Sequence, residues 1–244
     1  MGSFMKTISF AICAYNEEKY IGDTLRAIIE CASENLLEII VINNASTDKT
    51  AEVSSTFPNV KVVKENRKGL TYARQAGLTA AKGDLLACVD ADTHVSKEWF
   101  EILNREFEKD PKLVCLSGPY EFYDLPNSKV FLGLLMKVWY KGAQFIALFT
   151  GYLVQGGNFV AKRQALLDIG GFDTAIEFYG EDTNIARRLH NVGKVKFLSS
   201  FKAQSSARRL NAHGLIKLSY LYGANFISEI LFKKPATKQH KDFR

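Results

Sequence analysis

Apolar runs alternate with amphipathic stretches along the first half of the chain. Continuous apolar runs predict buried β-strands at residues 8–14, 37–42, 60–63 and 85–89. Apolar residues recur at helical spacing through Ile21, Leu25 and Ile28, and the small residues of segment 71–81 predict a second helix. Strands that alternate with helices in this way indicate βαβ units and a parallel sheet.

Polar clusters directly follow three of the predicted strands, at Tyr15–Glu18, Asn43–Asp48 and Asp90–Asp92. In parallel sheets flanked by helices, ligands bind in the crevice outside the carboxyl ends of the strands. We therefore expect these clusters to lie where a ligand binds.

The second half of the chain has a different pattern. Residues 130–154 are strongly apolar but are interrupted on one helical stripe by Lys137, Lys141 and Gln144. A bilayer span needs about 20 nearly unbroken apolar residues, so no span is expected here. The stretch predicts either a buried core helix or an interfacial helix that touches lipid. Residues 214–232 predict a second amphipathic helix, which a basic pair follows.

Composition narrows the class of protein. Apolar residues make up 47% of the 244 residues and charged residues 24%, which is typical of a globular chain and argues against fibrous, disordered and disulfide-scaffold proteins. The four cysteines form no CxxC pair and predict free thiols of a reducing compartment. We expect no secretory signal at the N-terminus, which favours a cytoplasmic location.

The net charge of +6 is unevenly distributed. Residues 187–244 contain 13 lysines and arginines against two acidic residues, whereas residues 1–186 are net negative. A basic C-terminal quarter indicates an anionic partner such as phosphate groups, a membrane surface or nucleic acid. The chain contains no recognisable RNA- or DNA-binding motif, so we expect no nucleic-acid partner.

Two acidic pairs are candidates for chemistry. Asp90 and Asp92 are alternate residues at a strand end, so both carboxylates can face one hard cation, although a solvated Asx turn is the alternative. Glu181 and Asp182 precede a helical pattern, where they can stabilise the helix N-terminus. A carboxylate at such a junction can equally act as a general base that activates a hydroxyl.

Paired glycines occur at Gly156-Gly157, before Asn158, and again at Gly170-Gly171. Glycine permits close backbone approach to a ligand or unusual dihedral angles. On this local pattern, a ligand contact and an ordinary turn remain equally open.

The order of these motifs resembles the family 2 glycosyltransferases. Six blocks match in the family's order: residues 14–18 (AYNEE), 41–50 (VINNASTDKT), 69–84, 90–92 (DAD), 156–173 and 181–182 (ED). The resemblance extends over about residues 6–200.

This resemblance implies a GT-A fold, which is an α/β fold with a Rossmann-like, mostly parallel sheet flanked by helices. It implies a nucleotide-sugar-binding half at residues 1–115, an acceptor-binding half at 116–204, and a basic amphipathic C-terminal segment at 205–244. The implied reaction is inverting transfer of a sugar from a nucleotide diphosphate sugar to an acceptor hydroxyl, with Mn²⁺ or Mg²⁺ on the diphosphate.

The resemblance also implies a role for each motif. Asp92 is expected to be the main metal ligand, with Asp90 assisting it or contacting the ribose, and Asp182, beside Glu181, is expected to be the catalytic base. Further residues expected at the nucleotide or donor are Ala14, Tyr15, Glu17, Asn44, Lys68, Arg74, Ala91, Arg208 and Arg209. Those expected at the acceptor or sugar are Gly156, Gly157 and Asn158.

One position departs from the family pattern. The family usually has an aspartate where this chain has Asn44, and that aspartate accepts a hydrogen bond from the base. An amide both donates and accepts, so uracil, guanine and thymine all remain open. Arg208 and Arg209 lie in a segment similar to a Ser-Ala-Arg-Arg motif of some members, where guanidinium groups suit phosphate oxygens. A basic patch for an anionic membrane surface is the alternative there.

The apolar helices with their basic rim predict an acceptor that is lipid-linked or a cell-surface glycan precursor, and peripheral placement on the inner face of a membrane. Two other functions remain open. A nucleotidyltransferase would need a glycine-rich basic loop after the first strand, which Ala14–Glu17 is not. A non-catalytic, basic membrane-binding module would leave the six ordered blocks unexplained.

Overall fold

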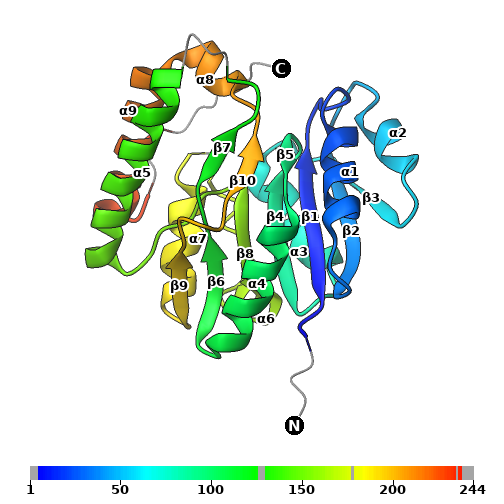
Figure 1. The fold of residues 1–244 in the computed structure, drawn as a ribbon, viewed down its shortest axis with the longest axis horizontal. Coiled ribbons are helices and arrows are strands. Elements are labelled where there is room, and N and C mark those ends of the chain that lie inside the picture. The colour runs from blue at the N-terminus through cyan, green and yellow to red at the C-terminus, as the bar shows by residue number, and fades with distance from the viewer. Residues whose placement is uncertain (1–4, 126–129, 177–178, 235, 238–244) are drawn as a thin grey trace.

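The centre of the molecule is a mixed β-sheet, and the predicted motifs lie at the ends of its strands, on one side of the molecule (Figure 1). The computed structural model describes residues 5–125, 130–176, 179–234 and 236–237. Within these residues the larger sheet has seven strands, in the order β3-β2-β1-β4-β8-β6-β9. Their bounds are β1 Ile8–Ala14, β2 Leu36–Asn44, β3 Val60–Glu65, β4 Leu85–Asp90, β6 Leu113–Ser117, β8 Asn158–Lys162 and β9 Lys194–Phe197.

Strand directions explain how distant motifs meet. β1 pairs in parallel with β2 and with β4, and β2 pairs in parallel with β3, which confirms the predicted parallel βαβ units. β8 runs antiparallel to β4, with Asn158 opposite Val89. Because of this reversal, the segment that leads into β8 lies beside the carboxyl end of β4, so Gly156 and Gly157 reach Asp90.

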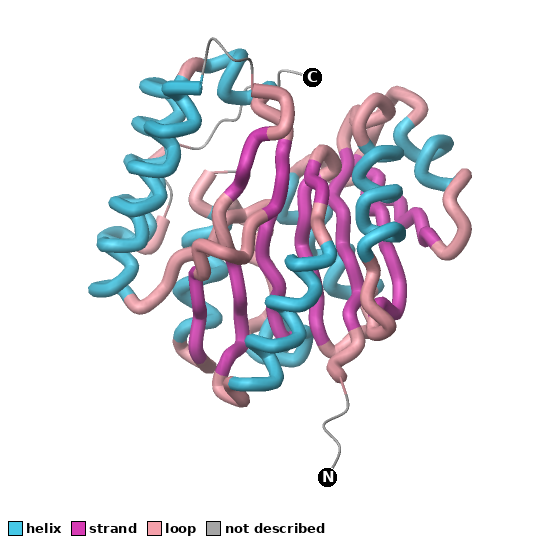
Figure 2. Tube along the Cα trace, viewed as in Figure 1, coloured by secondary structure: helices cyan, strands magenta, loops and turns pink. Residues whose placement is uncertain are grey.

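Helices cover both faces of the sheet (Figure 2). Their bounds are α1 Ile21–Cys31, α2 Thr50–Ser55, α3 Leu70–Ala80, α4 Lys97–Lys109, α5 Val130–Thr150, α6 Arg163–Asp168, α7 Glu181–His190, α8 Arg208–His213 and α9 Leu215–Phe232. Successive side chains of a strand point to opposite faces. Thus Phe10 of β1 packs in one core with α1 and α4, whereas Ala11 belongs to the other core, with α3, α6 and α7.

α5 and α9 pack against each other and form a pair beside the sheet instead of on one of its faces (Figure 1). In α5, Tyr140 and Ala143 are buried, whereas Leu148 and Phe149 are 79% and 78% exposed. A helix is therefore confirmed at Val130–Thr150, whereas residues 151–154 lie outside it, and the helix is not buried all round; the side chain of Lys137 lies outside the described part. Among the described helices, none is long and apolar enough to cross a bilayer.

A small second sheet joins the C-terminal segment to the main body. Its strands are β5 (Thr93–His94), β10 (Ala203–Ser205) and β7 (Tyr120–Phe122), with β10 in the middle. β5 follows Asp92 directly, and β10 leads into α8. This sheet therefore brings Arg208 and Arg209 next to the acidic residues at the end of β4.

Candidate active site

A cavity of about 720 Å³ lies at the carboxyl ends of β1, β2 and β4. Every residue expected to contact the donor, acceptor or metal lines this cavity except Asn158. Asn158 is fully buried behind the wall, where its side chain accepts from Trp99 Nε1 at 2.9 Å and donates to the Phe201 carbonyl at 2.9 Å. The expected acceptor contact of Asn158 is therefore wrong, because its amide is fixed inside the core.

The two glycines before Asn158 form a turn that packs closely on side chains of the cavity, and their contact with a ligand stays a prediction. A Cβ atom on Gly157 would collide with the Tyr120 hydroxyl and the Asp90 carboxylate, and one on Gly156 would lie 2.8 Å from Glu181 Oε1. Neither position has space for a side chain. The backbone of this segment therefore separates the two acidic pairs and contacts both.

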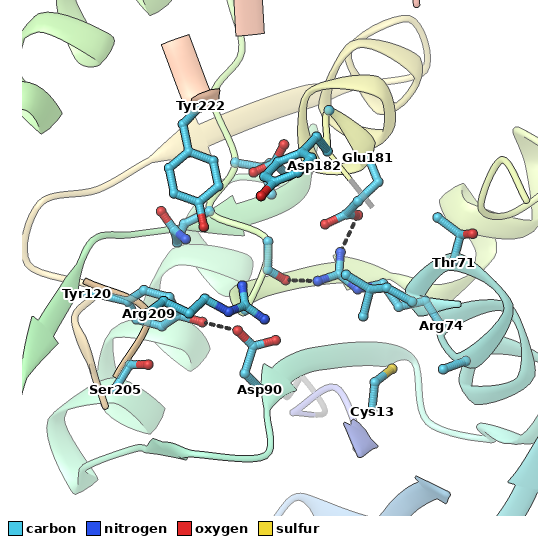
Figure 3. A pocket seen from close by; sticks show the side chains of 18 of the residues that line it. Cys13, Thr71, Arg74, Asp90, Tyr120, Glu181, Asp182, Ser205, Arg209 and Tyr222 are labelled. Atoms are coloured by element: carbon cyan, nitrogen blue, oxygen red, sulfur yellow. Dashed lines mark hydrogen bonds and ion pairs between the residues drawn. The ribbon is translucent and has the colours of Figure 1, made fainter. Parts of the chain in front are cut away.

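Asp90 and Asp92 lie at the end of β4 and have different partners. Asp90 Oδ2 accepts a hydrogen bond from the Tyr120 hydroxyl at 2.9 Å, as Figure 3 shows. Asp92 is buried, and burial raises its pKa to about 6 although the Arg208 charge opposes this shift. Both carboxylates remain hard oxygen ligands of the type that Mg²⁺ and Mn²⁺ prefer.

The donor set fits a divalent cation that a diphosphate helps to hold. In the described part of the chain, no group of three or more His, Cys, Asp or Glu side chains converges on a metal position. Asp90 and Asp92 could thus supply two ligands, and phosphate oxygens would complete the shell. Such an arrangement suits a cation that binds together with its substrate.

Arg208 connects the first strand end to the fourth. Its Nη1 and Nη2 lie 2.7 and 2.6 Å from the two carboxylate oxygens of Glu17, and its Nε lies 2.8 Å from Asp92 Oδ2. The guanidinium also lies over the ring of Tyr20, 4.7 Å from its centre. Arg208 therefore bridges two buried carboxylates that are far apart in the sequence.

Arg209 points into the middle of the cavity, beside Asp90 and Tyr120 (Figure 3). Burial alone would lower its pKa, but Tyr222, Asp90 and Asp92 favour the charged form and raise it. Figure 3 shows Asp182 and Tyr222 across the cavity from Asp90. Arg209 thus places a positive charge between the two acidic pairs.

Glu181 and Asp182 occupy the first turn of α7, after Gly180 in the left-handed conformation. Asp182 Oδ1 accepts from the Thr183 amide at 2.8 Å, so it stabilises the helix N-terminus, and it also lines the cavity. Burial raises the pKa of Asp182 and raises that of Glu181 to about 8. A carboxylate whose pKa is raised toward neutrality is suited to act as a general base.

Arg74, on α3, binds Glu181 and not the open part of the cavity. Its Nη1 forms an ion pair with Glu181 Oε2, its Nη2 donates to the Gly156 carbonyl at 2.5 Å, and both side chains are buried. The guanidinium lies over the ring of Phe159, 5.4 Å from its centre. The expected contact of Arg74 with a diphosphate finds no support in this geometry, and Arg74 instead positions Glu181.

Asn44, at the end of β2, holds the loop that follows β3. Its Oδ1 accepts from the Gly69 amide at 2.9 Å, and its Nδ2 donates to the carbonyls of Arg67 at 2.7 Å and Glu65 at 3.3 Å. These three bonds fix the orientation of the amide, because a flipped amide would face like groups. Contact between Asn44 and a nucleobase stays a prediction.

Ala14 and Tyr15 continue from β1 into the cavity wall. Lys68 Nζ donates to the Tyr15 hydroxyl at 2.8 Å and lies 4.0 Å from the centre of the tyrosine ring. Lys68 is therefore tied to Tyr15, at the side of the cavity formed by β1 and β2.

An aromatic wall is the part of the cavity that sequence reasoning missed. It consists of Tyr120, Phe122, Tyr140, Tyr179, Phe197, Tyr222 and Phe226. These residues come from β7, α5, β9, α9 and the segment before α7, so no local motif joins them. The helical spacing of the two apolar stretches predicted the helices α5 and α9, but it did not indicate which face of each helix lines the cavity.

Comparisons with known proteins identify relatives. The sequence profile of glycosyl transferase family 2 matches residues 9–170. The poly-β-1,6-N-acetyl-D-glucosamine synthase of Staphylococcus aureus is 28% identical in an alignment 205 positions long, which covers 79% of this chain and 48% of that protein. The corresponding synthase of Staphylococcus epidermidis is 29% identical in an alignment 194 positions long, which covers 75% of this chain and 45% of that protein. The chain thus spans about half the length of these curated relatives.

Solved structures share the fold. A mannosyltransferase from Pyrobaculum calidifontis, in complex with GDP-Man and Mn²⁺, has a TM-score of 0.66 at 19% identity, covering 92% of this chain and 63% of that one. Glucosyl-3-phosphoglycerate synthase from Mycobacterium tuberculosis, with Mn²⁺ and UDP-glucose, has a TM-score of 0.64 at 19% identity, covering 91% and 79%. The predicted α/β fold of the GT-A type is confirmed.

Proposed function

Because the chain belongs to glycosyl transferase family 2, we propose that it is an inverting glycosyltransferase that moves a sugar from a nucleotide diphosphate sugar to an acceptor hydroxyl. One observation carries the proposal. Asp90 at the end of β4 and Asp182 at the start of α7 lie across one cavity from each other, although they are far apart in the sequence, and Asp92 also lines this cavity (Figure 3). A cation-bound leaving group and a general base need this separation.

The donor would occupy the side of the cavity formed by β1, β2 and β4. Ala14, Tyr15, Glu17 and Lys68 would border the nucleotide, and Arg209 would face its phosphates. Asp92 and Asp90 would hold Mn²⁺ or Mg²⁺, which neutralises charge on the leaving diphosphate. The Mn²⁺ complexes of two structural neighbours support this assignment.

The acceptor would bind on the side of Asp182. In the reaction, Asp182 accepts the proton of the acceptor hydroxyl while the hydroxyl oxygen forms a bond to the anomeric carbon. The bond from that carbon to the diphosphate breaks, and its electron pair leaves with the diphosphate. Because attack and departure occur on opposite sides of the carbon, the configuration inverts.

We propose that the chain is divided into parts that bind the donor and the acceptor. Residues 1–115 would bind the nucleotide sugar, and 116–204 would bind the acceptor. Residues 205–244 supply Arg208, Arg209 and Tyr222 to the cavity wall, so the C-terminal segment would act on both substrates. Neither alternative function gains support, because a nucleotidyltransferase does not account for the family membership and a binding module does not account for the cavity.

The test of this function is release of nucleoside diphosphate. Purified protein is incubated with UDP-GlcNAc, UDP-glucose or GDP-mannose and Mn²⁺, and UDP or GDP is measured. We expect release from one class of donor, its loss with EDTA, and its loss in Asp92→Ala. Absence of release and of nucleotide binding for every donor would contradict the proposal.

The acceptor side carries a further element of the proposal, a lipid-linked acceptor and attachment to the inner face of a membrane. The exposed stripe of α5 contains Leu134, Val138, Phe145, Leu148 and Phe149, with Lys141 in its middle. α9 exposes Tyr220, Ile227, Leu231 and Phe232, and Lys233 and Lys234 follow it. Apolar side chains rimmed by lysines suit an anionic bilayer surface.

Vesicle sedimentation tests this attachment. We expect binding to phosphatidylglycerol vesicles that weakens at high salt, since each nearby lysine adds about 1 kcal/mol at the surface of an anionic membrane. Phe149→Gln with Leu148→Gln should reduce binding, whereas Leu37→Gln, an exposed leucine on β2, should not. A wild-type protein that stays in the supernatant at every salt concentration would contradict the attachment but not the transfer reaction.

A further inference from the structure

The Arg208 side chain occupies the ligand atoms that a cation would need. Its Nε lies 2.8 Å from Asp92 Oδ2, and its two terminal nitrogens bind both oxygens of Glu17. Glu17 and Asp92 are both almost fully buried. One positive side chain therefore binds two carboxylates from the ends of β1 and β4.

Guanidinium and divalent cation compete for the same oxygen. Both bind through the lone pairs of Asp92, and their like charges repel each other strongly at such a distance. A buried carboxylate is costly to leave without a positive partner, so Arg208 has no reason to move away unless another cation replaces it. If a cation took the place of Arg208 at Asp92, the guanidinium would need another anion in place of Asp92.

The donor diphosphate is an anion that can accept Arg208. Arginine pairs with phosphate oxygens through two parallel hydrogen bonds, as it does here with Glu17. Arg208 begins α8, and its Nε faces Asp92 at 2.8 Å, so the side of the guanidinium that binds Asp92 also faces a diphosphate held there by a cation.

Building on the proposed function, we infer that Arg208 is an exchange residue that makes cation binding depend on the donor diphosphate. Before the donor binds, Arg208 holds Asp92 and excludes Mn²⁺. When the diphosphate and the cation enter together, the cation takes Asp92 and Arg208 Nε donates to phosphate, while Nη1 and Nη2 keep their bonds to Glu17. Cation and diphosphate therefore each strengthen the binding of the other, as linkage requires.

The chain contains a matched control for this arrangement. Arg67 binds Glu65 through Nε at 3.0 Å and Nη2 at 2.8 Å, and its guanidinium lies 4.7 Å from the centre of the Tyr72 ring. The Arg208 guanidinium likewise lies 4.7 Å from the centre of a tyrosine ring, that of Tyr20, and binds a glutamate, Glu17. Unlike the ion pair of Arg67, that of Arg208 extends to Asp92, an aspartate of the proposed cation site.

The experiment measures Mn²⁺ binding by electron paramagnetic resonance of the free ion, with and without UDP or GDP. We expect the wild type to bind Mn²⁺ weakly without nucleotide and at least about tenfold more tightly with one, the scale of a charge-assisted hydrogen bond. Arg208→Gln should bind Mn²⁺ at least about tenfold more tightly than wild type without nucleotide, and nucleotide should add little. Arg67→Gln should behave as wild type.

Arg208→Lys keeps the charge but loses the paired hydrogen bonds of the planar guanidinium, so we expect Mn²⁺ affinities between those of wild type and Arg208→Gln. This variant carries the test if Arg208→Gln does not fold, as thermal unfolding would reveal. Unchanged Mn²⁺ affinity in the Arg208 variants, with nucleotide coupling retained, would overturn the inference. If neither UDP nor GDP binds to the wild type, the proposed donor site fails, whereas the nucleotide-free comparison still decides whether Arg208 excludes the cation.

Discussion

The two sides of the cavity are built in different ways. On the donor side, strand ends carry the functional groups, and the strands of β1 and β4 are buried on both faces. On the other side, α7 and α9 supply side chains from helices that pack against each other. The backbone of the sheet thus fixes the donor side, whereas contacts between side chains fix the opposite side.

Two ion pairs hold α7 in place, one to α3 and one to α9, and they differ in how fully they are buried and hydrogen-bonded. Arg74 and Glu181 are 3% and 7% exposed, and Arg74 also binds the Gly156 carbonyl. Glu229 of α9 is fully buried and binds Asn184 and Arg187 of α7, but Arg187 is 22% exposed. Within the described residues, Arg187 Nε and Glu229 Oε2 have no hydrogen-bond partner. The pair that attaches α9 is the less complete one.

The largest effect should come from Asp182, on the acceptor side of the cavity. Asp182→Asn keeps the shape of the side chain but cannot accept a proton, so transfer should fall about 10³-fold, within the usual range for loss of a general base. The rate of sugar transfer at saturating donor measures this. Asp173→Asn is the control, since Asp173 is exposed and only accepts from the Ala175 amide. Transfer at the wild-type rate in Asp182→Asn would assign the base elsewhere.

The pH profile gives an independent test of the same residue. Burial raises the pKa of Asp182 above the usual 3.8 of an aspartate. A base must be deprotonated to act, so activity falls as the pH falls through this raised pKa. We expect the acid limb of kcat/KM to lie above pH 3.8, and a limb at or below that value would contradict the environment described for Asp182.

The two ion pairs should differ in what they contribute to stability. Arg74→Gln leaves the buried Glu181 without its cation and should cost about 3–5 kcal/mol. Arg187→Gln should cost only about 1–2 kcal/mol, because water can reach this partly exposed site. Urea unfolding of both variants provides the comparison. Equal losses would mean that α9 is attached to α7 as firmly as α7 is attached to α3.

A smaller effect is expected at Asn44. Asn44→Asp directs a carboxylate oxygen at the carbonyls of Arg67 and Glu65, so the loop should shift and UDP and GDP should both bind about tenfold more weakly. Calorimetric titration of both nucleotides measures this, with Asn44→Ala as the comparison. A change in the ratio of the two affinities would show that the amide reads the base and does not merely position the loop.

Local sequence patterns were sufficient for the donor side. β1 has the predicted bounds Ile8–Ala14, and the predicted strand at 85–89 is β4. Strands of a parallel sheet are buried on both faces, so a short apolar run bounded by polar residues indicates such a strand. The polar residues that follow such strands reach the cavity because the sheet fixes their position. Asn44 lines the cavity as expected, but its hydrogen-bond partners lie in a loop that the local sequence pattern did not predict.

Partners distant in the sequence could not be predicted. Arg74 and Glu181 are 107 positions apart, and Arg208 and Glu17 are 191 apart. Each arginine alone is compatible with a phosphate contact, and only the fold shows which carboxylate it meets. Asn158 failed for a related reason: the glycine pair indicated a close approach, but the strand direction decides that the asparagine faces the core.

The central claim is that Asp92 binds the donor through a cation and that Asp182 acts only on the acceptor. Calorimetric titration of the donor with Mn²⁺ into wild type, Asp92→Ala and Asp182→Asn tests this claim most directly. We predict that Asp92→Ala loses the Mn²⁺-dependent part of donor binding, whereas Asp182→Asn keeps the wild-type affinity within about twofold, since a general base acts in the transition state. Equal loss of donor affinity in both variants would contradict the account.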